Sequence, residues 1–257
     1  MSRSAITTTG LRAGTSACLF DLDGVLTDTA TVHAHAWKEM FDRFLTARAQ
    51  EAHTPYDAFD QVTDYDTYVD GRSRADGTRA FLASRGIALP EGDPGDEPGA
   101  PTVAGLAAAK NAIVLRRIRH DGVEPYPGSL RYLKAVRSAG LLTAVVSSSA
   151  NCAEVLEAAG LTDLFEVRVD GLTAEDQHLA GKPAPDTYLA AAKLLHVEPG
   201  ESAIFEDALS GVAAGRAGGF GLVVGVDRVG QAAELREHGA DVVVDDLADL
   251  LGGVDEA

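Results

Sequence analysis

Two carboxylates follow the first apolar run in the chain, residues 17–20. Asp21 and Asp23 are two positions apart, so their side chains point to the same side of an extended chain. Gly24 comes next and allows a sharp turn. Holding carboxylates together is unfavourable unless a cation lies between them. Because hard divalent ions prefer oxygen ligands, we predict that Mg²⁺ binds here.

Polar side chains also follow other short apolar runs. Ligands of parallel sheets collect at the carboxyl ends of the strands, so we expect these side chains to meet at one edge. Besides Asp21 and Asp23, they are Ser147, Ser149 and Asn151 after the run 141–146, Lys182 before a predicted helix, and Glu206 and Asp207 after the run 203–205. The predicted metal ligands are Asp21, Asp23, Glu206 and Asp207.

This constellation predicts phosphoryl transfer through a covalent aspartyl-phosphate. A metal ion would screen a phosphate from Asp21, so that the carboxylate can attack phosphorus. Lys182 and the Ser147 hydroxyl would hold phosphoryl oxygens. Asp23 would then protonate the leaving oxygen and deprotonate the incoming one. The predicted catalytic residues are therefore Asp21, Asp23, Lys182 and Ser147.

The elements that must position these residues alternate between strand and helix after residue 127. Strands are predicted at 141–146, 167–169, 203–205, 222–226 and 242–244, and helices at 129–138, 151–159, 185–195 and 209–216. Such alternation is typical of an α/β fold with a doubly wound, mostly parallel sheet.

An all-helical block separates the first strand from the others. Its clearest helix carries one apolar stripe of Trp37, Met40, Phe41, Phe44 and Leu45. We therefore predict a small helical cap domain at 31–122, inserted into a catalytic core of residues 15–30 and 123–257. Residues 89–102 are rich in Pro, Gly and acidic residues and are predicted to form a solvated loop. Residues 1–14 are predicted to be a disordered leader.

The composition restricts the partners. The chain has 257 residues, 46% of them hydrophobic, and a formal net charge of −17. So acidic a protein is not expected to bind nucleic acid or an anionic membrane. Cys18 and Cys152 cannot form a disulfide framework, and there is no apolar run of membrane-spanning length. We expect a cytoplasmic monomer that acts on a small molecule.

Four segments resemble the motifs of the haloacid dehalogenase superfamily. Residues 21–28 resemble motif one, Ser147 motif two, residues 181–186 motif three and residues 205–211 motif four. All four occur in the order found in that superfamily, and the resemblance covers nearly the whole chain after residue 15.

Residues 28–38, 71–76 and 110–111 more closely resemble the hinge and cap of the β-phosphoglucomutase family. This resemblance implies a sugar-phosphate substrate, with Arg74 binding its distal phosphate and His33 lying beside Asp23 and Lys38. The substrate-binding residues that it implies are Gly71, Arg72, Arg74, Ser149, Asn151, His33, Trp37 and Lys110.

Two positions depart from the mutase pattern. Ala150 and Asp70 stand where that family has lysines. A mutase must hold a phosphate at both ends of its intermediate, so the loss of two cations keeps an alternative open, a phosphatase that hydrolyses a small sugar-phosphate monoester. A non-catalytic binding protein on the same fold is a third hypothesis.

Overall fold

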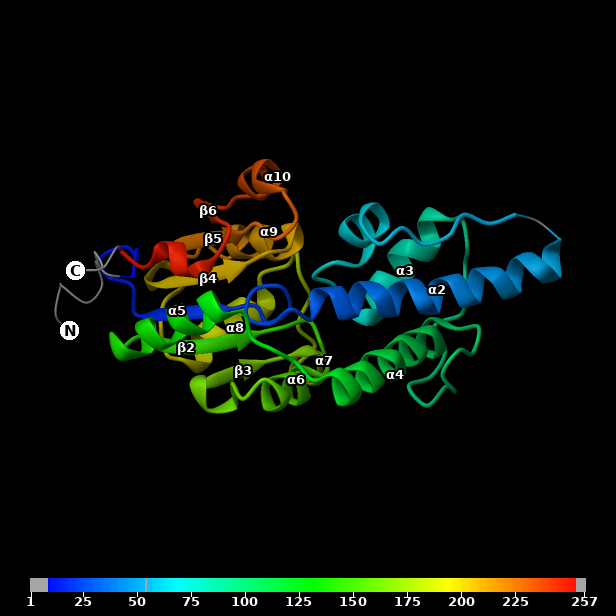
Figure 1. Cartoon of the computed structure of the whole chain (residues 1–257), viewed down its shortest axis with the longest axis horizontal. Helices are drawn as coiled ribbons and strands as arrows, with labels where there is room; N and C mark the ends of the chain where they lie inside the picture. Colours follow the sequence, from blue (N-terminus) through cyan, green and yellow to red (C-terminus); the bar gives the residue numbers. More distant parts are fainter. Residues whose placement is uncertain (1–8, 54, 253–257) are drawn as a thin grey trace. The chain divides into compact units, whose positions relative to one another are not determined.

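The computed structural model describes residues 9–53 and 55–252. The chain divides into two compact units, with junctions at Asp28/Thr29 and Gly122/Val123. The first unit contains the sheet, and the second is helical and lies between the two junctions in sequence (Figure 1). The first junction comes slightly before the predicted boundary after residue 30.

Six parallel strands form the sheet of the first unit, in the order β3-β2-β1-β4-β5-β6. Their bounds are β1 Ala17–Phe20, β2 Leu142–Val146, β3 Val167–Val169, β4 Ser202–Glu206, β5 Leu222–Val226 and β6 Val242–Val244. Every residue of β1 and β4 is buried, as expected for central strands that helices cover on both faces. The predicted doubly wound α/β fold is confirmed.

Helices pack on both faces of this sheet. Alternate side chains of β1 point to opposite faces: Leu19 packs with Tyr188 of α8 in one cluster, and the Phe20 ring meets Tyr132 of α5 at 6.4 Å. The helices of this unit are α5 Pro127–Ser138, α6 Cys152–Ala158, α7 Gly171–Asp176, α8 Asp186–Leu194, α9 Leu209–Ala217 and α10 Ala232–Glu237, with short 3₁₀ turns η2 Thr162–Leu164, η3 Pro199–Glu201 and η4 Leu247–Leu250.

The helical unit is built on an aromatic core. Phe41 of α2 stacks on Trp37 at 5.2 Å and meets Phe81 of α3 at 4.0 Å between ring centroids. Its helices are α2 Ala30–Ala52, the π-helical turn η1 Tyr65–Val69, α3 Arg74–Ser84 and α4 Val103–Asp121. Residues 89–102 contain no helix or strand, as predicted.

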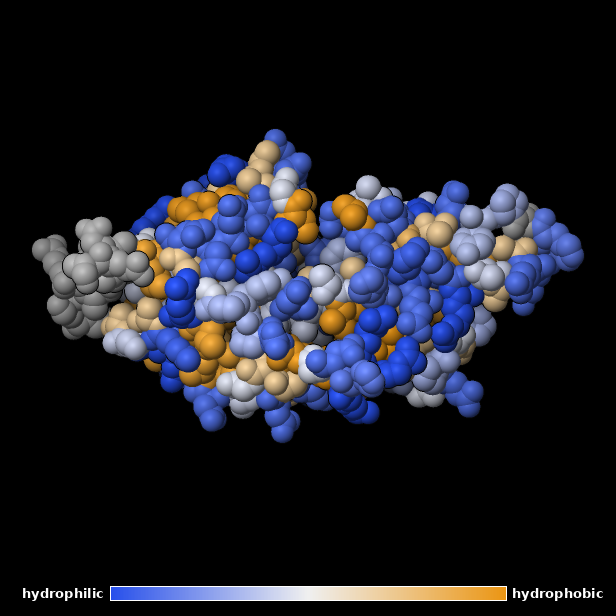
Figure 2. Space-filling view, viewed as in Figure 1, coloured by the Kyte–Doolittle hydropathy of each residue, from blue (hydrophilic) through white to orange (hydrophobic). Residues whose placement is uncertain are grey.

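The prediction for the N-terminal leader is wrong for the part that the structure describes. Thr9 and Leu11 are buried, and the Tyr132 hydroxyl donates to the Thr9 carbonyl oxygen at 2.9 Å. Residues 1–8 lie outside the described residues. The visible face in Figure 2 is mostly hydrophilic with scattered apolar side chains, as is usual for a protein surface. None of the helices that the structure describes has the length and apolar character needed to cross a bilayer.

Candidate active site

Asp21 lies at the carboxyl end of β1, where the chain leaves the sheet. Its backbone N–H donates to the Phe205 carbonyl oxygen at 2.9 Å, which extends the pairing of β1 with β4 by one residue. Gly24 then turns the chain with φ +87°, and its N–H donates to the Thr27 carbonyl oxygen at 2.8 Å. Glycine adopts this left-handed conformation without the steric cost of a Cβ atom. The turn holds the Asp21 carboxylate at the edge of the sheet.

Lys182 joins the first and fourth strands at this edge. Its ammonium donates to Asp21 Oδ1 at 2.5 Å and to Glu206 Oε1 at 2.5 Å, and its side chain is 1% exposed. Burial alone would lower the pKa of Lys182, but the charges of Asp21 and Glu206 raise it well above the usual value. Lys182 therefore stays protonated, and its charge is shared by two buried carboxylates.

Glu206 is fully enclosed by groups of the protein. Its Oε1 accepts hydrogen bonds from Lys182 and, at 2.9 Å, from the Tyr188 hydroxyl. Its Oε2 accepts from the Ala208 N–H at 3.1 Å. A Cβ atom on Gly211 would lie only 1.7 Å from Oε1. These contacts favour Glu206 as a residue that orients Lys182, and they leave a lone pair on Oε2 for a metal ion.

The carboxylates of Asp21, Glu206 and Asp207 are suited to a divalent cation. One oxygen of each lies within 4.8 Å of the others. Burial raises the pKa of Asp21 well above its usual value; the charge of Lys182 opposes this rise, and the negative charges of Glu206 and Asp23 add to it. A hard cation would relieve that repulsion and favour the ionised form. The chemistry of these donors therefore fits Mg²⁺.

Asp23 was also predicted to bind the metal, and this stays a prediction. Its carboxylate is not among the three whose oxygens come together. Instead, Ser147 Oγ donates to Asp23 Oδ2 in a long hydrogen bond of 3.5 Å. The same Oγ accepts from the Ser149 N–H at 3.0 Å, and Ser149 Oγ accepts from the Asn151 N–H at 3.1 Å. These hydroxyls shape the turn after β2 and bring Ser147 next to Asp23.

In the helical unit, the predicted substrate loop precedes α3. Gly71 has φ +66°, and Arg72 and Arg74 are half-buried. The Ser73 side chain accepts from the Asp76 N–H at 3.2 Å and so caps α3, of which Arg74 is the first residue. The loop is therefore defined by a cap and a glycine turn, which fix the backbone from which both arginines project.

Three of the predicted substrate-binding residues meet inside the helical unit. The Lys110 ammonium lies 3.0 Å from His33 Nδ1 and 5.0 Å from the centre of the Trp37 ring. Since an ammonium can only donate, His33 Nδ1 accepts. A Cβ atom on Gly77 would lie 3.2 Å from the Trp37 ring. These contacts favour a packing role for Trp37 over direct substrate contact.

His33 was predicted to lie beside Lys38, and this stays a prediction. Lys38 donates to Asp42 Oδ2 at 2.8 Å and to the Phe59 carbonyl oxygen at 2.9 Å. The lysine beside His33 is Lys110, which α4 supplies. Lys38 thus stabilises the chain between α2 and η1.

Sequence reasoning missed several residues that contact the site. Tyr188 binds Glu206, Arg228 binds the Gly24 carbonyl oxygen at 2.8 Å, and Gln231 binds the Asp207 carbonyl oxygen at 3.0 Å. Arg228 and Gln231 follow β5, so inspection of every strand end would have found them. No comparable signal marks Tyr188, which lies within a helix.

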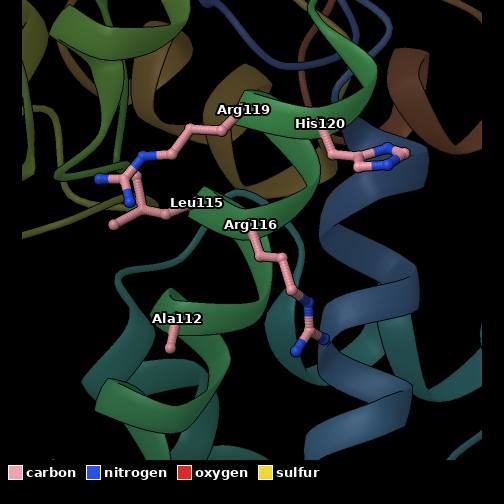
Figure 3. Close-up of a pocket in the computed structure, with 5 residues that line it drawn as sticks. All are labelled: Ala112, Leu115, Arg116, Arg119 and His120. Carbon is pink, nitrogen blue, oxygen red and sulfur yellow. The ribbon is translucent and has the colours of Figure 1, made fainter.

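A cavity of about 550 Å³ lies along α4 and is lined by Ala112, Leu115, Arg116, Arg119 and His120. None of the predicted site residues lines it. The side chains that line the cavity project from a single helix and do not converge on one point (Figure 3). One of them, Arg116, forms an ion pair with Glu39 at 3.0 Å. We assign no catalytic role to this cavity.

Comparison with known proteins identifies relatives over almost the whole chain. A sequence model of the family described as haloacid dehalogenase-like hydrolase matches residues 15–219. The β-phosphoglucomutase of Mycobacterium bovis is 56% identical over 245 residues, which are 94% of each chain. That of Bacillus subtilis is 30% identical and covers 91% of each chain. The crystal structure of β-phosphoglucomutase from Clostridium difficile matches with a TM-score of 0.70 at 26% identity, over 92% of this chain and 93% of the other.

Proposed function

Because the chain belongs to the family of haloacid dehalogenase-like hydrolases and is a phosphoryl-transfer enzyme, we propose that it is a sugar-phosphate mutase that converts β-glucose 1-phosphate to glucose 6-phosphate. The relative from Mycobacterium bovis, which bears the name of that activity, supports the choice of substrate. The observation that carries the chemistry is the Lys182 bridge between Asp21 and Glu206, since it orients a carboxylate beside a permanent positive charge.

Asp21 is the nucleophile in this proposal. One of its oxygens forms a bond to phosphorus, and the bond between phosphorus and the ester oxygen of the sugar breaks. Lys182 neutralises the charge that remains on the aspartyl-phosphate, and Ser147 donates to a phosphoryl oxygen. Mg²⁺, when held by Asp21 and Asp207, would supply further positive charge to the phosphoryl group. Ser149 and Asn151 belong to the same turn and are proposed to contact the phosphate as well.

Asp23 is the proposed acid and base. It gives a proton to the oxygen that leaves phosphorus and takes one from the hydroxyl that attacks the aspartyl-phosphate. For a mutase, the 6-hydroxyl of β-glucose 1-phosphate attacks the phosphorus of the aspartyl-phosphate, the bond between phosphorus and Asp21 breaks, and a bisphosphate forms. The 1-phosphoryl group then passes to Asp21, Asp23 protonates the sugar oxygen that it leaves, and glucose 6-phosphate is released. The 3.5 Å contact with Ser147 supports this role because it fixes the direction of the Asp23 carboxylate.

The helical unit is proposed to bind the phosphate that is not reacting. Arg74 and Arg72 carry positive charge on the loop that begins at Gly71, and a guanidinium matches the geometry of phosphate oxygens. His33 and Lys110 form a second polar group in this unit and are proposed to contact the sugar phosphate.

Hydrolysis of a sugar-phosphate monoester is the second candidate. Ala150 favours it, since the turn between Ser149 and Asn151 carries no cation of its own. Asp70 adds a negative charge next to residues 71–74, the arginine loop. Both changes weaken the retention of a bisphosphate, and water would then accept the phosphoryl group.

One assay separates the two candidates. The purified protein is incubated with Mg²⁺, β-glucose 1-phosphate and a trace of glucose 1,6-bisphosphate, and glucose 6-phosphate and free phosphate are followed separately. We expect glucose 6-phosphate to accumulate with little free phosphate. Release of phosphate without isomerisation would replace the mutase with the phosphatase.

Two variants test the assigned roles in the same assay. Asp21→Asn is expected to abolish all turnover, whereas Asp163→Asn, an exposed aspartate of η2, serves as the matched control. Arg74→Ala is expected to raise the KM for the sugar phosphate by about tenfold, because a charge-assisted pair with phosphate is lost. Unchanged mutase activity in Arg74→Ala would remove the cap contact from the mechanism.

A further inference from the structure

The loop after β5, residues 227–231, has no role in the chemistry proposed above, yet it contacts both loops that carry the metal-binding carboxylates. The loop has a rigid shape of its own. Asp227 Oδ1 accepts from the N–H groups of Gly230 at 2.7 Å and Gln231 at 2.8 Å, and the Asp227 N–H donates to the Val244 carbonyl oxygen at 2.8 Å. An aspartate that binds the backbone just after itself fixes a turn.

Arg228 projects from this turn onto the loop that follows Asp21. Its Nε donates to the Gly24 carbonyl oxygen at 2.8 Å, and its Nη1 donates to the Asp245 carbonyl oxygen at 3.0 Å. The guanidinium also stacks on the Tyr126 ring, 3.8 Å from its centre. With 17% of its side chain exposed, Arg228 is largely withdrawn from solvent. A planar group with several fixed donors is well suited to hold carbonyl oxygens of separate segments.

Gln231 reaches the other loop. Its Nε2 donates to the Asp207 carbonyl oxygen at 3.0 Å. The two loops also touch directly, since a Cβ atom on Gly24 would lie 1.7 Å from Asp207 Oδ2. The contacts therefore form a closed ring that runs from Gly24 to Arg228, along the turn to Gln231, and back through Asp207.

The hydrogen bonds between β1 and β4 do not by themselves fix the spacing between the Asp21 loop and the Asp207 loop. Asp21 makes the last hydrogen bond between β1 and β4, and Asp207 lies beyond the end of β4. Without a cation, their negative charges repel. Mg²⁺ requires near-ideal octahedral geometry at short ligand distances, so small changes in ligand spacing weaken its binding. We propose that Arg228 and Gln231 are positioning residues that hold the Asp21 loop and the Asp207 loop at the spacing that Mg²⁺ requires. This inference rests on the proposed function, because it assumes that the ion binds at these carboxylates.

The test measures Mg²⁺ binding by calorimetry and by the shift in melting temperature, without substrate. Arg228→Met is expected to weaken Mg²⁺ binding by about tenfold, comparable to the loss of other residues that orient metal ligands. Arg228→Lys keeps the charge but not the paired donors and should recover only part of the affinity. Gln231→Ala is expected to weaken binding by about threefold through the single hydrogen bond that it removes.

Arg216→Met is the matched control, since Arg216 is 68% exposed and lies on α9 outside the ring. Its Mg²⁺ affinity should equal that of the wild type. In the activity assay, Arg228→Met should lower kcat and raise the Mg²⁺ concentration for half-maximal activity, with the KM for sugar phosphate within about twofold of the wild type, since the proposed Arg74 contact is intact.

The outcomes distinguish a failure of the inference from a failure of the proposed function. If Arg228→Met only lowers the melting temperature and leaves Mg²⁺ affinity unchanged, Arg228 is merely structural and the inference is overturned. If Arg228→Met does not fold, an unchanged affinity in Gln231→Ala overturns it. A wild-type protein that binds no Mg²⁺ and turns over no phosphate ester would instead refute the proposed function together with the inference.

Discussion

Lys182 Nζ lies 2.5 Å from Asp21 Oδ1 although the two residues are 161 positions apart in the sequence. The lysine shares its single charge between Asp21 and Glu206, and all three side chains are buried. Lys182 thus brings together Asp21, the proposed nucleophile, which follows β1, and Glu206, which ends β4. Loss of the Lys182 charge leaves the negative charge of these carboxylates buried without a cation.

Lys182→Met is therefore expected to destabilise the metal-free protein. Removal of one partner from a buried ion pair typically costs about 3–5 kcal/mol because the remaining charge is buried without compensation. The free energy of unfolding, measured by chemical denaturation in the presence of EDTA, checks this value. Lys193→Met is the control, since Lys193 is an exposed residue at the end of α8 and its loss should change stability by less than about 0.5 kcal/mol. Equal stability of both variants would mean that Asp21 and Glu206 do not depend on the lysine.

Asp207→Asn and Glu206→Gln should differ in their effect on Mg²⁺. Both residues belong to the cluster of carboxylates that could hold the ion, but Glu206 also accepts the hydrogen bond that orients Lys182. Asp207→Asn is expected to abolish the rise in melting temperature that Mg²⁺ produces when it binds the folded protein. Glu206→Gln should reduce Mg²⁺ affinity by about tenfold through the orientation of its neighbours. A complete loss of Mg²⁺ binding in Glu206→Gln would make Glu206 a direct ligand instead.

The fold was predictable because its strands are short apolar runs between helices with regular patterns. The predicted strands 167–169, 222–226 and 242–244 agree with β3, β5 and β6. The short helices α7 and α10 were not predicted, since six residues make less than two turns and show no apolar stripe. The buried part of the leader was missed for a related reason, because its contacts are with residues far along the chain.

The candidate site was predictable where residues stand at strand ends, and less so where contacts join helices. His33 and Trp37 are four positions apart and share one helix face, but Lys38 is one position further and points elsewhere. The lysine next to His33 comes from α4, and no local pattern relates the two helices. The enclosure of Glu206 likewise depends on Tyr188. Tertiary packing brings Tyr188 to β4, and no local sequence pattern predicts that contact.

The pair Arg79 and Glu91 links the loop 89–102 to the arginine loop. The Arg79 guanidinium binds Glu91 at 2.7 Å and Asp76 Oδ1 at 2.7 Å, and Asp76 accepts from the Ser73 hydroxyl that caps α3. Glu91→Gln should raise the KM for the sugar phosphate by up to about fivefold, since exposed ion pairs contribute at most about 1 kcal/mol. An unchanged KM at low salt would show that the loop does not influence Arg74.

Gly24→Ala tests whether the close approach of the first loop to Asp207 is needed for Mg²⁺ binding. The new Cβ would lie 1.7 Å from Asp207 Oδ2, so the carboxylate must move, and φ is +87°. Gly14→Ala is the matched control, because Gly14 has φ +93° but no atom within 4 Å of the new Cβ. Both variants place an alanine at a positive φ, which costs about 1 kcal/mol or more. Only in Gly24→Ala does the new Cβ atom collide with another side chain. We expect Gly14→Ala to lower the melting temperature and to bind Mg²⁺ normally, whereas Gly24→Ala should lose most of its Mg²⁺ affinity. If Gly24→Ala bound Mg²⁺ as tightly as Gly14→Ala, Asp207 would have a second productive position, and the spacing of the two loops would not control the ion.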